Sequence, residues 1–211
     1  MVDGPEWAYV NWLSAKGAGL KAEAKVALGA FLLGTENWSS SDKRNFIRWL
    51  DRARDGFDDE KAIVPHPVMT KLILPVLRDW IESDPGAAEP HLLLGRFHDW
   101  KLDPAHPEEH FRASLQRDPA EVEAIRGLAY ALLDIVERNQ HHLPGTYLGD
   151  RLSDVARTDE IISLCDALPD VEEAGRLKRR AAELGGHAAG LTRSRGAAVY
   201  RFHSGSRPPS S

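Results

Sequence analysis

The stretch HPEEH, from His106 to His110, contains the residue types that could do metal chemistry. Imidazole nitrogens are common zinc ligands, and two histidines four positions apart share one face of a helix. A glutamate beside such a pair can activate a zinc-bound water for hydrolysis. His141 and His142 form a second histidine pair. A metal-binding or metal-dependent hydrolytic helical protein that uses His106, His110, His141 and His142 is therefore the alternative hypothesis.

Pro107 argues against this metal site. Proline is tolerated at the first position of a helix, so a helix is expected to start at Pro107 with His106 at its cap. A histidine at the cap does not share the helix face that ligation at i and i+4 requires. The chain also lacks the glycine-rich phosphate-binding motifs and the G-x-S-x-G motif of serine hydrolases. We therefore expect no catalytic residue, no resident metal and no cofactor.

Cys165 is the only cysteine, so the chain cannot form an intramolecular disulfide. It lies on a helical apolar stripe with Ile161 and Leu168, which favours a packed, inert thiol over a nucleophile. The N-terminus lacks the basic and apolar pattern of a secretory signal. The longest apolar run, Val26 to Gly34, is about half the roughly 20 residues that a membrane-spanning helix needs. These features predict a cytoplasmic protein with no membrane partner.

Helical periodicity of apolar residues runs through most of the chain, whereas strand patterning is nearly absent. The spacing predicts helices over 5–16, 21–34, 41–55 and 68–83. Pro75 is expected to kink the last of these or to mark its start.

Two similar stretches, SDPGAAEPHLLLG from Ser83 and RDPAEVEAIRGLA from Arg117, occur in the middle of the chain. Their Asp-Pro pairs, at Asp84 and Asp118, are 34 residues apart (118 − 84). Aspartate is a good N-cap and proline fits the first helical position, so both stretches are predicted to start helices. A 34-residue period is typical of a helix-turn-helix unit that must stack on its neighbours.

The segment Ala88 to Glu121 resembles a tetratricopeptide repeat, through Leu94-Gly95 in its first helix, Phe111 in its second helix and the closing Pro119. The resemblance implies an all-α, right-handed stack of antiparallel helix pairs, a TPR-like α-solenoid with flanking capping helices. The expected organisation is an N-terminal helical cap at 1–54, helical repeats at 55–155, C-terminal capping helices at 156–190, and a basic, largely disordered tail at 191–211.

The resemblance further implies a non-enzymatic module that binds a protein or peptide, with an acidic peptide as one option, in the concave groove of the repeats. The residues expected to line this groove are Leu92, Arg96, Asp99, Trp100, Glu123, Arg126, Tyr130 and Asp134. Arginine can bind carboxylates through two hydrogen bonds, and aromatic residues can act as apolar anchors. Reversing the charge of Arg96 and Arg126 is therefore expected to abolish partner capture and to leave the helical fold intact.

Charge is unevenly distributed along the chain, which has 27 Lys and Arg against 32 Asp and Glu and a net charge of −5. From Arg176 onward the charged residues are basic, with Glu183 as the single acidic residue. This basic end predicts either a contact with the protein's own acidic surface or a solubilising tail. Nucleic acid is not an expected partner, because the interleaved aromatic residues that would stack on bases are missing. Binding of nucleic acid is considered only for this basic end.

Overall fold

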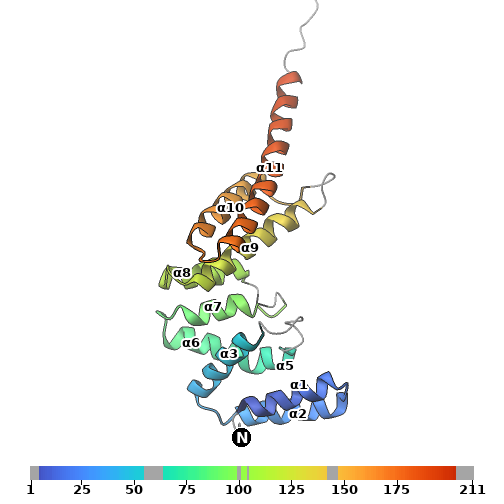
Figure 1. The fold of residues 1–211 in the computed structure, drawn as a ribbon, viewed down its shortest axis with the longest axis vertical. Helices are drawn as coiled ribbons and strands as arrows, with labels where there is room; N and C mark the ends of the chain where they lie inside the picture. The colour runs from blue at the N-terminus through green and yellow to red at the C-terminus, as the bar shows by residue number, and fades with distance from the viewer. Residues whose placement is uncertain (1–4, 55–63, 99–100, 104, 142–146, 203–211) are drawn as a thin grey trace, which may run out of the picture. The chain divides into compact units, whose positions relative to one another are not determined.

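The computed structural model describes residues 5–54, 64–98, 101–103, 105–141 and 147–202, and side chains from Trp7 to Gly190 within these ranges. The described residues form helices and their connections and contain no strand, so the all-α prediction is confirmed (Figure 1). The chain divides into two compact units, unit 1 at 1–106 and unit 2 at 107–211. This division falls inside Ala88 to Glu121, the segment predicted to be one repeat.

The described part of unit 1 begins with a helical hairpin, which further helical segments follow. Gly19, at φ 73°, lets the chain turn between the first two helices, because glycine adopts the left-handed region without strain. Figure 1 shows these two helices side by side at the start of the chain. The elements are α1 (Pro5–Gly17), α2 (Lys21–Thr35), α3 (Ser40–Arg54), α5 (His66–Val68), η1 (Met69–Ile73), α6 (Leu74–Ser83) and α7 (Glu89–Arg96).

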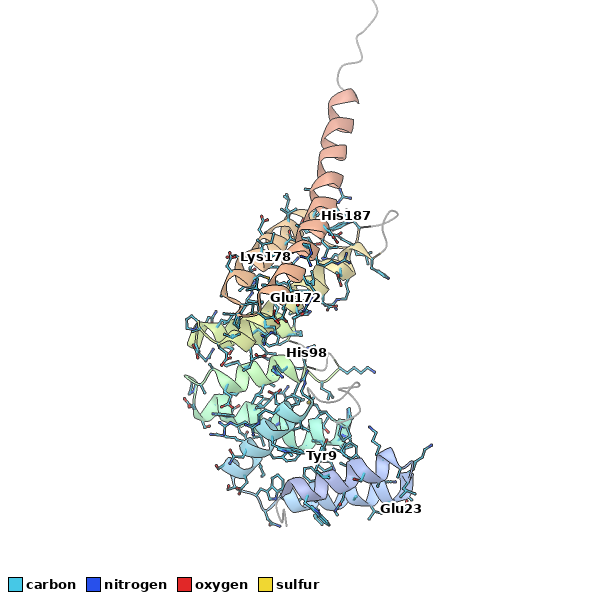
Figure 2. All side chains as sticks on the ribbon, viewed as in Figure 1. Tyr9, Glu23, His98, Glu172, Lys178 and His187 are labelled. Atoms are coloured by element: carbon cyan, nitrogen blue, oxygen red, sulfur yellow. The ribbon has the colours of Figure 1, made fainter. Side chains whose placement is uncertain are left out.

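An aromatic cluster forms the centre of the unit 1 core. Tyr9, Phe31 and Phe46 come from α1, α2 and α3, and their ring centroids are 4.9 to 5.2 Å apart. All three side chains are buried, and Tyr9 is labelled in Figure 2. Burial raises the pKa of the Tyr9 phenol above its ordinary value. Tilted and edge-on ring pairs at this spacing add about 0.5–1.5 kcal/mol each to the gain from burial.

A π-helical turn, η1, interrupts the helix predicted over 68–83. The Leu74 amide donates to the Met69 carbonyl, five residues back, instead of four residues back as in an α-helix. Pro75 has no N–H and cannot supply the α-helical bond to Lys71. The α-helix α6 then begins at Leu74, with Pro75 in its first turn, so the prediction that Pro75 marks a helix start is confirmed.

Unit 2 consists of α8 (Pro107–Arg117), α9 (Val122–Gln140), α10 (Arg151–Leu164), the 3-10 turn η2 (Cys165–Ala167) and α11 (Val171–Phe202). Successive helices pack against each other, and α11 also contacts α9. The ring of Phe111 on α8 lies directly against Gly127 on α9. Cys165 is buried in the core of this unit, as the apolar stripe predicted. The predicted start of a helix at Pro107 is also confirmed.

Each of the two stretches starts a helix, as predicted, but neither helix begins at its Asp-Pro pair. Asp84 is the C-cap of α6, and α7 starts at Glu89 with Pro90 in its first turn. In the second copy, the Asp118 carboxylate accepts from the Ala120 amide at 3.1 Å, which stabilises a turn. The helix α9 then starts at Val122, capped by the Glu121 carboxylate. A short turn therefore separates each Asp-Pro pair from the helix that follows.

The predicted domain boundaries at 54/55, 155/156 and 190/191 remain predictions. The helix α10 spans the second of them, and the backbone of α11 continues past the third to Phe202. The basic tail was predicted to be largely disordered, and its residues 203–211 lie outside the described residues.

We predict that Gly127→Ala destabilises unit 2 by about 1–3 kcal/mol, because a methyl group there would lie 2.4 Å from the buried Phe111 ring. Gly186→Ala on α11 is the matched control. A methyl group at Gly186 meets nothing within 4 Å, so this change should stabilise the helix by roughly 0.5–1 kcal/mol. The measurement is the urea concentration at which Cys165 becomes open to alkylation. A Gly127→Ala protein as stable as the unmodified chain would contradict the close contact.

Candidate functional site

The structure distributes the predicted groove residues between the two units. Leu92 and Arg96 lie on α7 in unit 1, and Glu123, Arg126, Tyr130 and Asp134 lie on α9 in unit 2. Asp99 and Trp100 lie outside the described residues. The structure therefore brings together the four residues of α9, and we consider the residues of each unit separately.

Arg96 is part of a contact between two helices of unit 1. Its Nε donates to the Asp51 carboxylate of α3 at 2.8 Å, and the two side chains are only 17% and 16% exposed. The Arg96 carbonyl oxygen also accepts from the guanidinium of Arg54. Leu92 is half-buried on the same helix. Arg96 thus holds α7 against α3.

Four residues of α9 and α11 form a connected polar network, which we name the Tyr130 surface: Glu123, Arg126, Tyr130 and Glu173. Arg126 Nε donates to Glu173 Oε2 at 2.9 Å, and Arg126 also donates to Glu123. The Tyr130 hydroxyl donates to Glu173 Oε1 at 3.2 Å. The hydrogen bond to Glu123 is the main cause that raises the pKa of Arg126. Desolvation, assisted by the Glu173 charge, raises the pKa of Tyr130.

Tyr130 is the exposed aromatic residue of this surface. Its side chain is 45% exposed, although its hydroxyl is bonded to Glu173 on the neighbouring helix. Asp134, one turn further along α9, is exposed and pairs with Arg138 at 2.8 Å. The arrangement presents an aromatic ring inside a frame of ion-paired side chains. Such a surface suits binding, since aromatic residues and arginine are enriched at interface hot spots.

The ion pairs of Arg96 and Arg126 change the expected result of reversing their charges. A carboxylate at either position would face Asp51 in unit 1, or Glu123 and Glu173 in unit 2. Like charges at this distance repel each other, so both units would lose stability. The expectation that the fold remains intact in such a variant is therefore withdrawn, and loss of binding by that variant would not identify a groove.

The histidines do not form a common metal centre in the described part of the chain. His98 Nε2 lies 2.9 Å from the Ala105 carbonyl oxygen, and the His98 and His106 ring centroids are 6.2 Å apart. His106 precedes the first residue of α8, whereas His110 lies inside that helix. His141 follows α9, and His142 lies outside the described residues. Among described residues, no group of three or more His, Cys, Asp or Glu is placed to hold a metal ion.

Basic residues at the start of α11 pair with acidic residues of the same unit. Arg180 Nε donates to Glu137 of α9 at 2.7 Å, and Lys178 pairs with Asp166. Arg176 pairs with Glu172 on its own helix at 2.9 Å. Figure 2 labels Glu172 and Lys178 on α11. This part of the basic end therefore lies against the protein's own acidic surface, which is one of the two interpretations drawn from the sequence.

A buried carboxylate in unit 2 was missed by the sequence analysis. Asp154 is fully buried and accepts from Asn139 Nδ2 at 3.0 Å, from the Tyr147 hydroxyl at 2.6 Å and from Arg157 at 2.7 Å. Burial and the bond to Asp154 raise the pKa of Tyr147. Because these donors satisfy the carboxylate, the cluster is structural: it ties Tyr147 to α9 and α10. In the same region the Asp150 carboxylate caps α10 by accepting from the Ser153 amide.

Comparisons with protein-family models, with curated proteins and with solved structures found no match to this chain. Among the described residues, no helix has both the length and the apolar character needed to cross a membrane.

We predict that Asp51→Ala and Arg96→Ala each lower the free energy of unfolding of unit 1 by about 1–3 kcal/mol. Each change removes one partner of an ion pair whose side chains are mostly buried. The double variant should be less destabilised than the sum, with a coupling of about 0.5–3 kcal/mol. Tryptophan fluorescence during urea unfolding measures this, since all six tryptophans belong to unit 1: Trp7, Trp12, Trp38, Trp49, Trp80 and Trp100. Additive effects would show that the two residues do not interact.

We predict that Cys165 resists alkylation in the native protein up to about pH 9 and reacts readily in urea, because burial raises the pKa of its thiol. A raised native pKa favours the protonated, folded form. The contribution of the protonated thiol to the stability of unit 2 is complete below the ordinary thiol pKa, about 8.5. It is lost as the pH rises above that value. Unit 2 should therefore unfold at lower urea concentration above pH 8.5. Cys165→Ala should remove this part of the pH dependence, and an unchanged profile would contradict the assignment.

Proposed function

We propose that this chain is a non-enzymatic, cytoplasmic module that binds a protein or peptide through the Tyr130 surface of unit 2. We further propose that its helices form a TPR-like stack of antiparallel pairs. One observation carries the functional proposal: a half-exposed tyrosine is fixed by its hydroxyl to Glu173 within a network of charged side chains. The single cysteine supports a reducing compartment.

The fixed position of Tyr130 favours binding energetically. A side chain that is already ordered loses little conformational freedom when a partner covers it, so more of the contact energy is retained as affinity. The ring gives a large apolar contact area, while the surrounding ion pairs can form the polar rim of an interface. Arg126 and its carboxylate partners therefore serve to hold the anchor in place.

The ion pairs also favour one class of partner. Arg126 already contacts two carboxylates, Glu123 and Glu173, so these three residues carry a net charge of −1 (1 − 2). An acidic peptide would have to displace one of these pairs. We therefore favour a neutral or basic segment that encloses the tyrosine ring, in place of the acidic peptide suggested by the arginines in the sequence.

We predict that Tyr130→Ala weakens partner binding at least roughly tenfold, the loss typical of an interface anchor. The measurement is affinity capture by the full-length protein from the cells that contain it, followed by titration of the captured partner. Tyr130→Phe should retain most of the affinity because it keeps the ring.

Leu152→Ala is the matched control, because Leu152 is also an exposed apolar residue of unit 2 but lies on α10. It should leave binding unchanged. A partner that binds equally well to the Tyr130→Ala protein, or the absence of any stoichiometric partner, would overturn the proposal.

A further inference from the structure

Unit 1 contains a pocket with a volume of about 380 Å³ between α2, the start of α3 and the η1–α6 segment. This volume is at the small end of the range for ligand pockets, roughly 300–1,000 Å³. Leucine, valine and proline side chains form one part of its wall, and charged side chains form another. All of these residues belong to unit 1, so the pocket is separate from the Tyr130 surface.

Three cations line the pocket, and one of them, Arg44, is held by contacts within unit 1. The Arg44 guanidinium lies 4.5 Å from the centre of the Trp80 ring and donates to Ser83 Oγ at 3.1 Å. It is therefore held at the wall by its own unit. Lys43 and Lys71, from α3 and η1, make no ion pair with any residue that the structure describes. Their ammonium groups can therefore bind an anion without breaking an existing pair.

The apolar wall provides a second kind of contact. Leu33 on α2 lines the pocket and is 65% exposed. Leu72 and Val76, on η1 and α6, also line the pocket and are buried. A ligand in the pocket would cover Leu33 and remove apolar surface from water, which is favourable by roughly 25 cal/mol per Å².

Two acids limit the charge that the pocket can accept. Glu36 and Asp79 also line it, so three cations and two carboxylates leave one excess positive charge (3 − 2 = 1). A dianion such as phosphate would meet these carboxylates and be disfavoured. A carboxylate carries one negative charge and matches the excess.

We propose that this pocket binds a compact carboxylate attached to an apolar group, with the carboxylate held by Lys43 and Lys71 and the apolar group against Leu33 and Val76. Lys71 lies in the π-helical turn, a feature that is frequent at functional sites. Two sources share this chemistry, a small apolar carboxylic acid and the C-terminal residue of a peptide. The site and its test are independent of the proposed function of unit 2.

The test uses calorimetric titration of the full-length protein with two matched pairs of probes. Phenylacetate is compared with phenylacetamide, and an N-acetylated tripeptide ending in leucine is compared with its C-terminal amide. We expect the acid of at least one pair to bind with a Kd of roughly 1 mM or lower and its amide to bind at least tenfold more weakly. Tighter binding of the peptide acid identifies a chain end as the source, and tighter binding of phenylacetate identifies a small acid.

The double variant Lys43→Gln, Lys71→Gln should weaken binding of the preferred acid by roughly 10-fold to 100-fold, because it removes two charge-assisted contacts. Lys25→Gln is the control, since Lys25 is an exposed lysine of α2 that does not line the pocket. Tryptophan fluorescence checks that unit 1 of each variant is folded.

Three results would overturn the proposal. They are no binding of either acid below about 10 mM, equal binding of acid and amide, and equal weakening by the Lys25→Gln control and the double variant. Leu33→Ser provides a further check. It should weaken binding of the acid without changing the preference for the acid over its amide.

Discussion

Arginine–carboxylate pairs between helices are the constraint that orients neighbouring helices in both units. In unit 1, Arg48 forms two 2.6 Å hydrogen bonds with Glu89, 41 residues away, and fastens α3 to α7. In unit 2, Arg112 forms two 2.7 Å hydrogen bonds with Glu160, 48 residues away, and joins α8 to α10. Paired hydrogen bonds of this type fix the relative orientation of two helices, because the planar guanidinium and carboxylate must face each other. Apolar packing supplies most of the stabilisation, and these pairs fix the angle at which the helices meet.

The sequence predicted individual helices well and their beginnings less well. Apolar periodicity indicated the helices because burial on one face imposes it, and Pro75 and Pro107 marked helix starts correctly. The Asp-Pro pairs misled because aspartate stabilises turns as readily as helix caps. In the first copy a second proline, Pro90, lay five residues beyond Pro85 and was the one that entered the helix. Proline fits the first turn of a helix at either position, and in the structure Pro90 takes that place.

The candidate sites could be predicted only in part, because they depend on contacts between distant segments. Tyr130 was predicted to line a binding groove, which stays a prediction, and its partner Glu173 is 43 residues away and gave no signal. Arginine is a residue type that often binds ligands, yet the ion pair with Glu173 gives Arg126 a structural role. The pocket of unit 1 combines three separate helical segments, and nothing in the sequence places Lys43 and Lys71 on the wall of the same pocket. Residue type limits what a side chain can do, and its neighbours decide which of these roles it takes.

Because of the π-helical turn, the directions of the side chains that line the pocket depend on the number of residues in that turn as well as on their identity. Each residue of an α-helix rotates the next side chain by about 100°, so one additional residue in a turn shifts the phase of everything that follows it. The α6 side chains Val76 and Asp79 lie after this turn, and Val68 lies before it. In a chain that lacked one residue within Met69–Ile73, identical lining side chains would face a different direction. Insertion or deletion of a single codon at this point is therefore a route by which related chains could gain or lose the pocket without any substitution.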